Sequence, residues 1–122
     1  MDTEYKVVLD EKEVEAAERA AEDAPGVYTL TLAKPFTYED ITADKLTFDF
    51  EGLTVADSLA VEQELVTLGK PVIVRELNGD YLLRIACRAC ETKVSVDFLM
   101  RLPIRAGNNL MSAVRSFLMR AE

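Results

Sequence analysis

The sequence predicts an α+β domain in which β-hairpin-like strands precede a mostly helical bundle of about four helices. Residues 27–50 contain two runs in which apolar and polar side chains alternate, as in half-buried strands. From residue 53 onward, apolar side chains recur at helical spacing instead, and glycine or proline separates the segments. A chain of 122 residues can bury a core of this kind without metals or disulfides.

Residues 1–26 are expected to form a mobile acidic extension, which leaves 27–122 as a single domain. The extension carries nine acidic and three basic residues, and within its helix-prone part, 10–24, Val14 is the one large apolar side chain. A helix of this composition buries little surface, and Pro25-Gly26 would end it. The start of the chain lacks the basic and then apolar layout of a signal peptide, so no secretory leader is expected.

Two strands are expected next, over 27–32 and 45–50. Pro35-Phe36 is expected to break the first strand, so the connection would span 33–44, which is long for a hairpin. Alternation places one apolar face of each strand toward the core: Tyr28, Leu30 and Leu32 in the first, and Leu46, Phe48 and Phe50 in the second.

A helix is expected from Thr54 to Leu68. Thr54 suits the N-cap, and Asp57 stands three residues later, as in a capping box. Gly69 supplies the residue that follows the helix, and Pro71 blocks its continuation. Its apolar residues form an imperfect stripe that Glu62 interrupts: Val55, Leu59, Leu65, Val66 and Leu68.

Residues 72–90 allow two interpretations. Asn78-Gly79 after the β-prone run 72–74 is typical of a hairpin. A helix with Asp80 as its N-cap, reaching Cys90, fits better, because the adjacent apolar pairs at 82–83 and 85–86 suit a period of 3.6. This helix would bury Leu82, Leu83, Ala86, Ala89 and Cys90 on one face.

Two further helices complete the expected bundle. Ser95 would cap a short helix over 96–102, which Pro103 ends, and a last helix would run from about 106 to 120. The apolar stripe of the last helix either packs on the domain's own core or meets another protein. Its candidate partner-binding residues are Leu110, Val114, Arg115, Phe117 and Leu118.

Composition argues against an enzyme and against a cofactor or metal site. The chain has no histidine, which removes the commonest general base and metal ligand. Cys87 and Cys90 form a C-x-x-C pair, but the pair stands at the expected C-terminal end of a helix, and no further ligands complete a zinc site. We therefore expect both thiols to be reduced and inert. Neither a membrane span nor a nucleic-acid-binding tract is expected.

Charge is distributed unevenly along the chain. Residues 27–80 carry ten acidic and four basic side chains, whereas residues 81–122 carry three acidic and seven basic ones. The charges are either solvated on separate helices or complementary within or between copies of the chain. Complementarity between copies predicts a homo-oligomer.

The order of segments from residue 27 to the C-terminus resembles the tail assembly chaperones of long-tailed bacteriophages. The resemblance begins with the strand over 27–32, which Lys34-Pro35-Phe36 follows, and continues through 46–57 into an acidic helix that reaches Gly69. It is carried further by three segments: the Ala-containing helix over 81–89, the Leu-Pro stop that ends 98–103, and the final helix over 110–118 with its Arg-Ser-Phe-Leu ending.

This resemblance implies a non-catalytic protein of the infected host cell's cytoplasm that is absent from the mature virion. Such chaperones bind the long helical tape measure protein and assist assembly of the tail tube protein around it, in many phages through a longer, frameshifted form. The alternative from the residues alone is a small acidic regulatory or adaptor module that binds other proteins.

Overall fold

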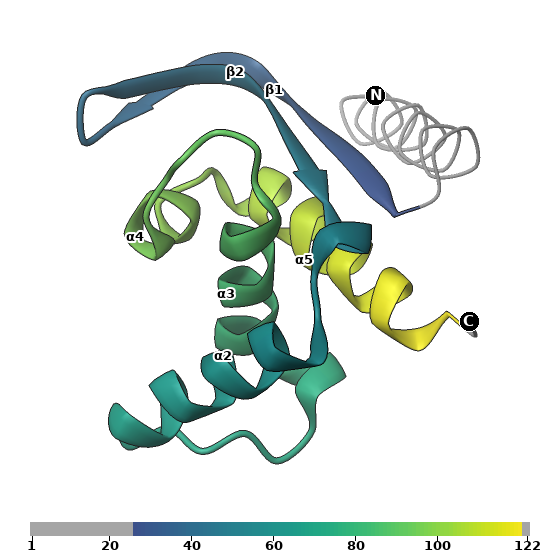
Figure 1. Ribbon diagram of the computed structural model, residues 1–122. Coiled ribbons are helices and arrows are strands. Elements are labelled where there is room, and N and C mark those ends of the chain that lie inside the picture. The colour runs from purple at the N-terminus through teal and green to yellow at the C-terminus, as the bar shows by residue number, and fades with distance from the viewer. Residues whose placement is uncertain (1–25, 121–122) are drawn as a thin grey trace, which may run out of the picture.

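The computed structural model describes residues 26–120 and confirms the α+β class (Figure 1). Residues 1–25, which hold nearly all of the expected extension, lie outside the described part. The described elements are strands β1 (Val27–Tyr38) and β2 (Ile41–Asp49), helices α2 (Val55–Thr67), α3 (Gly79–Ala89), α4 (Val96–Met100) and α5 (Ile104–Met119), and the 3₁₀ turns η1 (Phe50–Gly52) and η2 (Arg75–Leu77).

The two strands form an antiparallel hairpin that lies over the helices (Figure 1). Val27 pairs with Asp49 and Leu30 with Leu46, so the expected pairing of the two runs is confirmed. The expected inward face is buried as well: Tyr28, Leu30, Leu32, Leu46, Phe48 and Phe50. The alternation of apolar and polar residues was therefore sufficient to predict which face of the hairpin is buried.

The long connection expected over 33–44 is wrong. β1 continues to Tyr38, and Glu39 and Asp40 join the strands as a two-residue turn. Pro35 does not end the strand, because the register shifts between Thr31 and Phe36 and four residues of β1 there face one of β2. A proline is tolerated in such a bulge, where a regular ladder hydrogen bond is not required.

Helix α2 begins and ends as expected. The backbone N–H of Thr54 donates to Asp57 Oδ2 at 2.8 Å, which completes the capping box. That hydrogen bond, together with one from Arg88, lowers the pKa of Asp57. At the other end Gly69 has φ +75°, and the N–H of Lys70 donates to the Leu65 carbonyl at 2.8 Å, the pattern of a Schellman motif.

Helix α3 is confirmed over the ambiguous stretch, but its cap is Asn78 and not Asp80. The side chain of Asn78 accepts a hydrogen bond from the backbone N–H of Tyr81 at 2.8 Å. Asp80 lies inside the first turn and pairs with Lys70 and Arg84. α3 packs against α2, α4, α5 and β2, and most of its apolar side is buried: Tyr81, Leu82, Ile85, Ala86 and Ala89. Leu83 and Cys90 are half-buried.

The short helix α4 supports the outer half of the hairpin. Ser95 caps α4 as expected, since its hydroxyl accepts from the Phe98 N–H at 3.0 Å. The Phe98 ring meets the Phe36 ring edge to face at a centroid distance of 5.1 Å, and the Ser95 hydroxyl also donates to the carboxylate of Glu39. After Pro103, α5 begins at Ile104, two residues before the expected start.

The hairpin turn generates a stability prediction. Glu39 and Asp40 both have positive φ, 53° and 63°, as both turn residues do in the type I′ turns that favour glycine at the second position. Asp40→Gly is therefore expected to stabilise the protein by about 0.5 kcal/mol, because a left-handed conformation costs energy for side chains with a Cβ. Urea denaturation followed by circular dichroism measures the change.

The matched control is Asp44→Gly, in the body of β2. There glycine weakens the strand, so stability is expected to fall. An equal loss from both substitutions would contradict the strain assigned to the turn.

Candidate protein-binding surface

The expected partner-binding stripe of α5 is mostly core. Leu110 and Val114 are fully buried, so neither can contact a partner in the folded protein. Phe117 is half-buried against the Phe50 ring at 5.4 Å, and Leu118 also packs at the edge of the core. Arg115 is occupied as well, because its Nε donates to the Glu76 carbonyl at 2.7 Å and joins α5 to η2. The stripe therefore closes the core against the hairpin.

Exposed apolar side chains gather elsewhere, on α2 and on the connection that follows it. Of the ten large apolar side chains exposed within residues 26–120, seven fall between 55 and 77. Six of them define what we call the α2–η2 surface: Val55, Leu59, Val66, Ile73, Val74 and Leu77. Ile73 is 92% and Leu77 74% exposed. Exposed apolar side chains that gather in this way mark sites of protein interaction.

The α2 part of this surface is one helical stripe that Glu62 interrupts. Val55, Leu59 and Val66 stand at spacings of four and seven residues, which places them on one face over about 16 Å of helix. Val61 and Leu65 point the other way, into the core. Between Leu59 and Val66 the same stripe contains Glu62, whose carboxylate pairs with Arg75 of η2. This ion pair joins the connection to the stripe.

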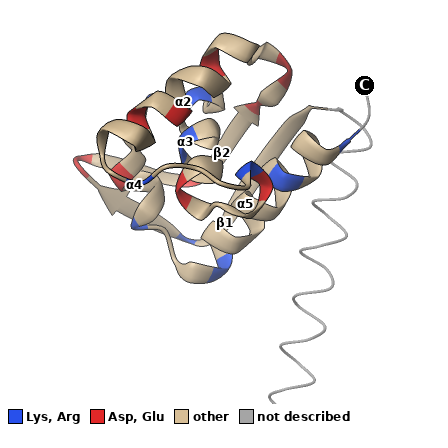
Figure 2. Ribbon diagram, turned by 90° about the horizontal axis from the view of Figure 1, so that it is seen from below, with Lys and Arg blue, Asp and Glu red and all other residues tan. Residues whose placement is uncertain are grey.

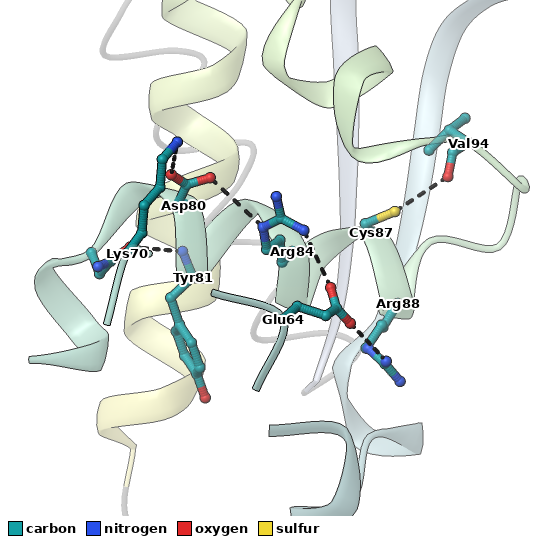
Figure 3. A network of polar contacts seen from close by, with 9 residues as sticks. Glu64, Lys70, Asp80, Tyr81, Arg84, Cys87, Arg88 and Val94 are labelled. Carbon is teal, nitrogen blue, oxygen red and sulfur yellow. Dashed lines mark hydrogen bonds and ion pairs between the residues drawn. The ribbon is translucent and has the colours of Figure 1, made fainter. Parts of the chain in front are cut away.

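The remaining carboxylates of α2 are held on its opposite flank by arginines of α3. Arg88 reaches Asp57 at 2.9 Å. It also reaches Glu64 at 3.1 Å, and Arg84 reaches Glu64 at 3.2 Å (Figure 3). Asp80 continues the chain of pairs with Arg84 and Lys70. Because α2 directs these acidic groups toward α3, they are kept off its apolar stripe.

A depression of about 510 Å³ lies on this charged flank of α2, lined by Ala60, Gln63, Glu64, Thr67, Leu68 and Arg84. Its two charged groups, Glu64 and Arg84, pair with each other at 3.2 Å, and the buried Nε of Arg84 forms no hydrogen bond within residues 26–120. It therefore offers no free titratable group to a reactant.

The C-x-x-C pair is placed for packing. Both cysteines are free and half-buried, and the Cys87 thiol donates to the Val94 carbonyl at 3.2 Å. Burial is the main reason that the pKa of Cys87 is raised and that the pKa of Cys90 is raised to about 11. Both thiols are therefore protonated near neutral pH and are poor nucleophiles.

Within the described part of the chain, no group of His, Cys, Asp and Glu side chains is arranged to hold a metal ion. The helices seen between residues 26 and 120 are all too short or too polar to cross a bilayer. Comparisons with models of protein families, with curated proteins and with solved structures found no match to this chain.

Replacement of leucine by alanine is expected to change stability by different amounts in the core and on the surface. Leu110→Ala is expected to lower the free energy of unfolding by about 2–5 kcal/mol, because it leaves a cavity in the core. Leu59→Ala is expected to change it by less than about 0.5 kcal/mol, because Leu59 is exposed. Urea denaturation of both variants measures the difference, and similar losses would mean that Leu59 is not a surface residue.

The second prediction concerns the thiols. In the Cys87→Ala variant, the remaining Cys90 is expected to react with a disulfide reagent at pH 8 about a hundredfold more slowly in the native protein than in urea, because its raised pKa leaves little thiolate. Absorbance of the released thiolate gives both rates. Equal rates would show that Cys90 is a reactive residue.

Proposed function

We propose that this protein is a non-catalytic tail assembly chaperone that binds the tape measure protein and assists assembly of the tail tube protein around it in the host cytoplasm. The observation that carries the proposal is the α2–η2 surface, an apolar region left exposed by a domain whose core is already closed. The family resemblance of the sequence supplies the identity of the partner.

An exposed apolar surface of this kind suits the task of such a chaperone. A long apolar helix aggregates unless its surface is covered, and burial of apolar area is the main source of affinity for it. No chemistry is required for this task. One domain covers a short length of such a helix, so many copies would have to bind along it, and the proposal therefore includes a homo-oligomer.

The uneven distribution of charge along the chain would help to fix the relative positions of neighbouring copies. Acidic side chains are prominent on α2, where each pairs with an arginine of the same domain, whereas α5 carries basic ones (Figure 2). Because these carboxylates are already paired, head-to-tail contacts that close as rings or continue as spirals would draw on the net charge of the two halves of the chain: ten acidic and four basic residues over 27–80, and three acidic and seven basic ones over 81–122.

Co-expression tests the function. The tape measure protein encoded by the same phage or prophage is expected to be soluble when the full chain is co-expressed and to precipitate without it, because the chaperone covers its apolar face. Centrifugation of lysates and co-purification through a tag on the tape measure protein measure the effect. The control is an unrelated acidic protein of similar size, expressed to the same level. A tape measure protein that stays insoluble beside abundant folded chaperone would contradict the function.

A further inference from the structure

We propose that α2 is a hinged flap, held closed on the domain largely by ion pairs, that opens as a unit while the hairpin, α3, α4 and α5 stay folded. The flap is the helix Val55–Thr67, and its opening would uncover Val61 and Leu65 in addition to the apolar stripe that is already exposed. This inference concerns a motion of the protein itself and does not rest on the proposed function.

Helix α2 is attached to the domain mainly through one neighbour. It lies at the edge of the molecule, and α3 is the one described element with which it makes extensive contact (Figure 1). Of its thirteen residues only Val61 and Leu65 are buried, whereas α3 buries five of eleven. Because burial of apolar area is the main source of packing energy, polar contacts take a comparatively large share in holding α2.

The charged side chains of α2 are all acidic, and each of them pairs with an arginine outside the helix. The three carboxylates are Asp57, Glu62 and Glu64, and the helix has no basic residue. Their partners are Arg84 and Arg88 of α3 and Arg75 of η2. All of these side chains except that of Arg84 are more than a quarter exposed, so dissolved salt can screen the pairs.

The contact between α2 and α3 is also incompletely packed. The depression of about 510 Å³ described above lies along it, lined by residues of α2 and its C-cap and by Arg84. Beside the depression, Nε of Arg84 and Oδ1 of Asp80 are buried without a hydrogen bond to any described residue, at 3.7 Å from each other. Unfilled space and buried polar atoms that lack a hydrogen bond both weaken the closed arrangement.

The connections on either side of α2 are anchored to the domain at their far ends. Before α2, Phe50 is buried in the core, and after it the Glu76 carbonyl accepts a hydrogen bond from Arg115 of α5. Between α2 and η2, residues 68–71 are all exposed, and Gly69 has φ +75°. A few exposed loop residues of this kind can absorb the change in backbone direction that a hinge requires.

Native-state amide hydrogen exchange of the full chain tests the flap. After correction for intrinsic rates, the amides of α2 are expected to exchange about tenfold or more faster than the buried amides of α5. Low concentrations of urea are expected to leave the α2 rates unchanged, because local opening exposes little surface. Equal exchange rates and equal urea dependence in α2 and α5 would overturn the proposal, since α2 would then open only when the whole domain unfolds.

Arg88→Met tests whether ion pairs close the flap. It removes the partner of Asp57 and Glu64, so the α2 amides are expected to exchange about fivefold faster at low salt. Raising sodium chloride from about 0.02 M to about 0.5 M is expected to accelerate α2 exchange in the unmodified chain, and to do so less in this variant. An absence of any salt effect in the unmodified chain would overturn closure by ion pairs.

The matched control is Arg101→Met, which removes the same charge where the guanidinium lies over the Tyr38 ring of the hairpin. It is expected to leave α2 exchange unchanged, and equal acceleration of α2 by both variants would overturn the role of Arg88. Circular dichroism checks that the variants fold.

Glu62→Gln is a milder second variant, because it keeps the shape of the side chain and loses only the pair with Arg75. It is expected to accelerate α2 exchange about twofold, and an unchanged rate would count against closure by ion pairs. Because exchange is measured without a partner, its outcome is separate from the co-expression test. The flap can fail while the tape measure protein is solubilised, and the tape measure protein can stay insoluble while α2 opens as proposed.

Discussion

Burial of α3 is the constraint on which the rest of the structure depends. This helix contacts α2, α4, α5 and β2, so its sequence must satisfy several different neighbours. Small and aliphatic side chains, such as Ala86 and Ile85, allow close approach inside the core. On the α2 side, Arg84 and Arg88 meet acidic partners, and the fully buried Tyr81 bonds the Ser58 hydroxyl at 2.6 Å. This division of roles fixes which face of α2 points inward and leaves the opposite stripe exposed.

The parts of the fold that local chemistry determines could be predicted from the sequence. Alternation identified both strands, and the caps at Thr54 and Ser95 located two helix starts, because these signals depend on neighbours within four residues. The prediction that Pro35 ends the first strand was wrong. The energetic cost of a proline in a strand depends on whether it stands in a regular hydrogen-bonded ladder or in a bulge. The cap of α3 was misplaced for a related reason: Asn78 and Asp80 both suit a cap, and the pairing of Asp80 with Arg84 and Lys70 is set by tertiary structure.

The candidate surface was harder to predict than the fold. An apolar stripe is equally consistent with a core and with a partner, and the regular stripe of α5 around Leu110 and Val114 belongs to the core. The sequence predicts an imperfect stripe on α2, which Glu62 interrupts, whereas the structure has apolar residues on two faces of this helix. Val61 and Leu65 form one face and Val55, Leu59 and Val66 the other. Helix α2 therefore has more apolar residues than packing on one core requires. This excess is the feature of the sequence that could have revealed the exposed surface.

The aromatic contacts between the hairpin and the last helix also constrain the order of folding. Phe48 stacks near Phe50, and Phe50 contacts Phe117, which lies on α5. The apolar face of the hairpin is thus completed by a residue 67 positions later in the chain. During synthesis the hairpin emerges from the ribosome first and stays partly uncovered until α5 has followed, because its covering contacts are non-local. A protein whose proposed task is to protect apolar surfaces therefore exposes one of its own during synthesis.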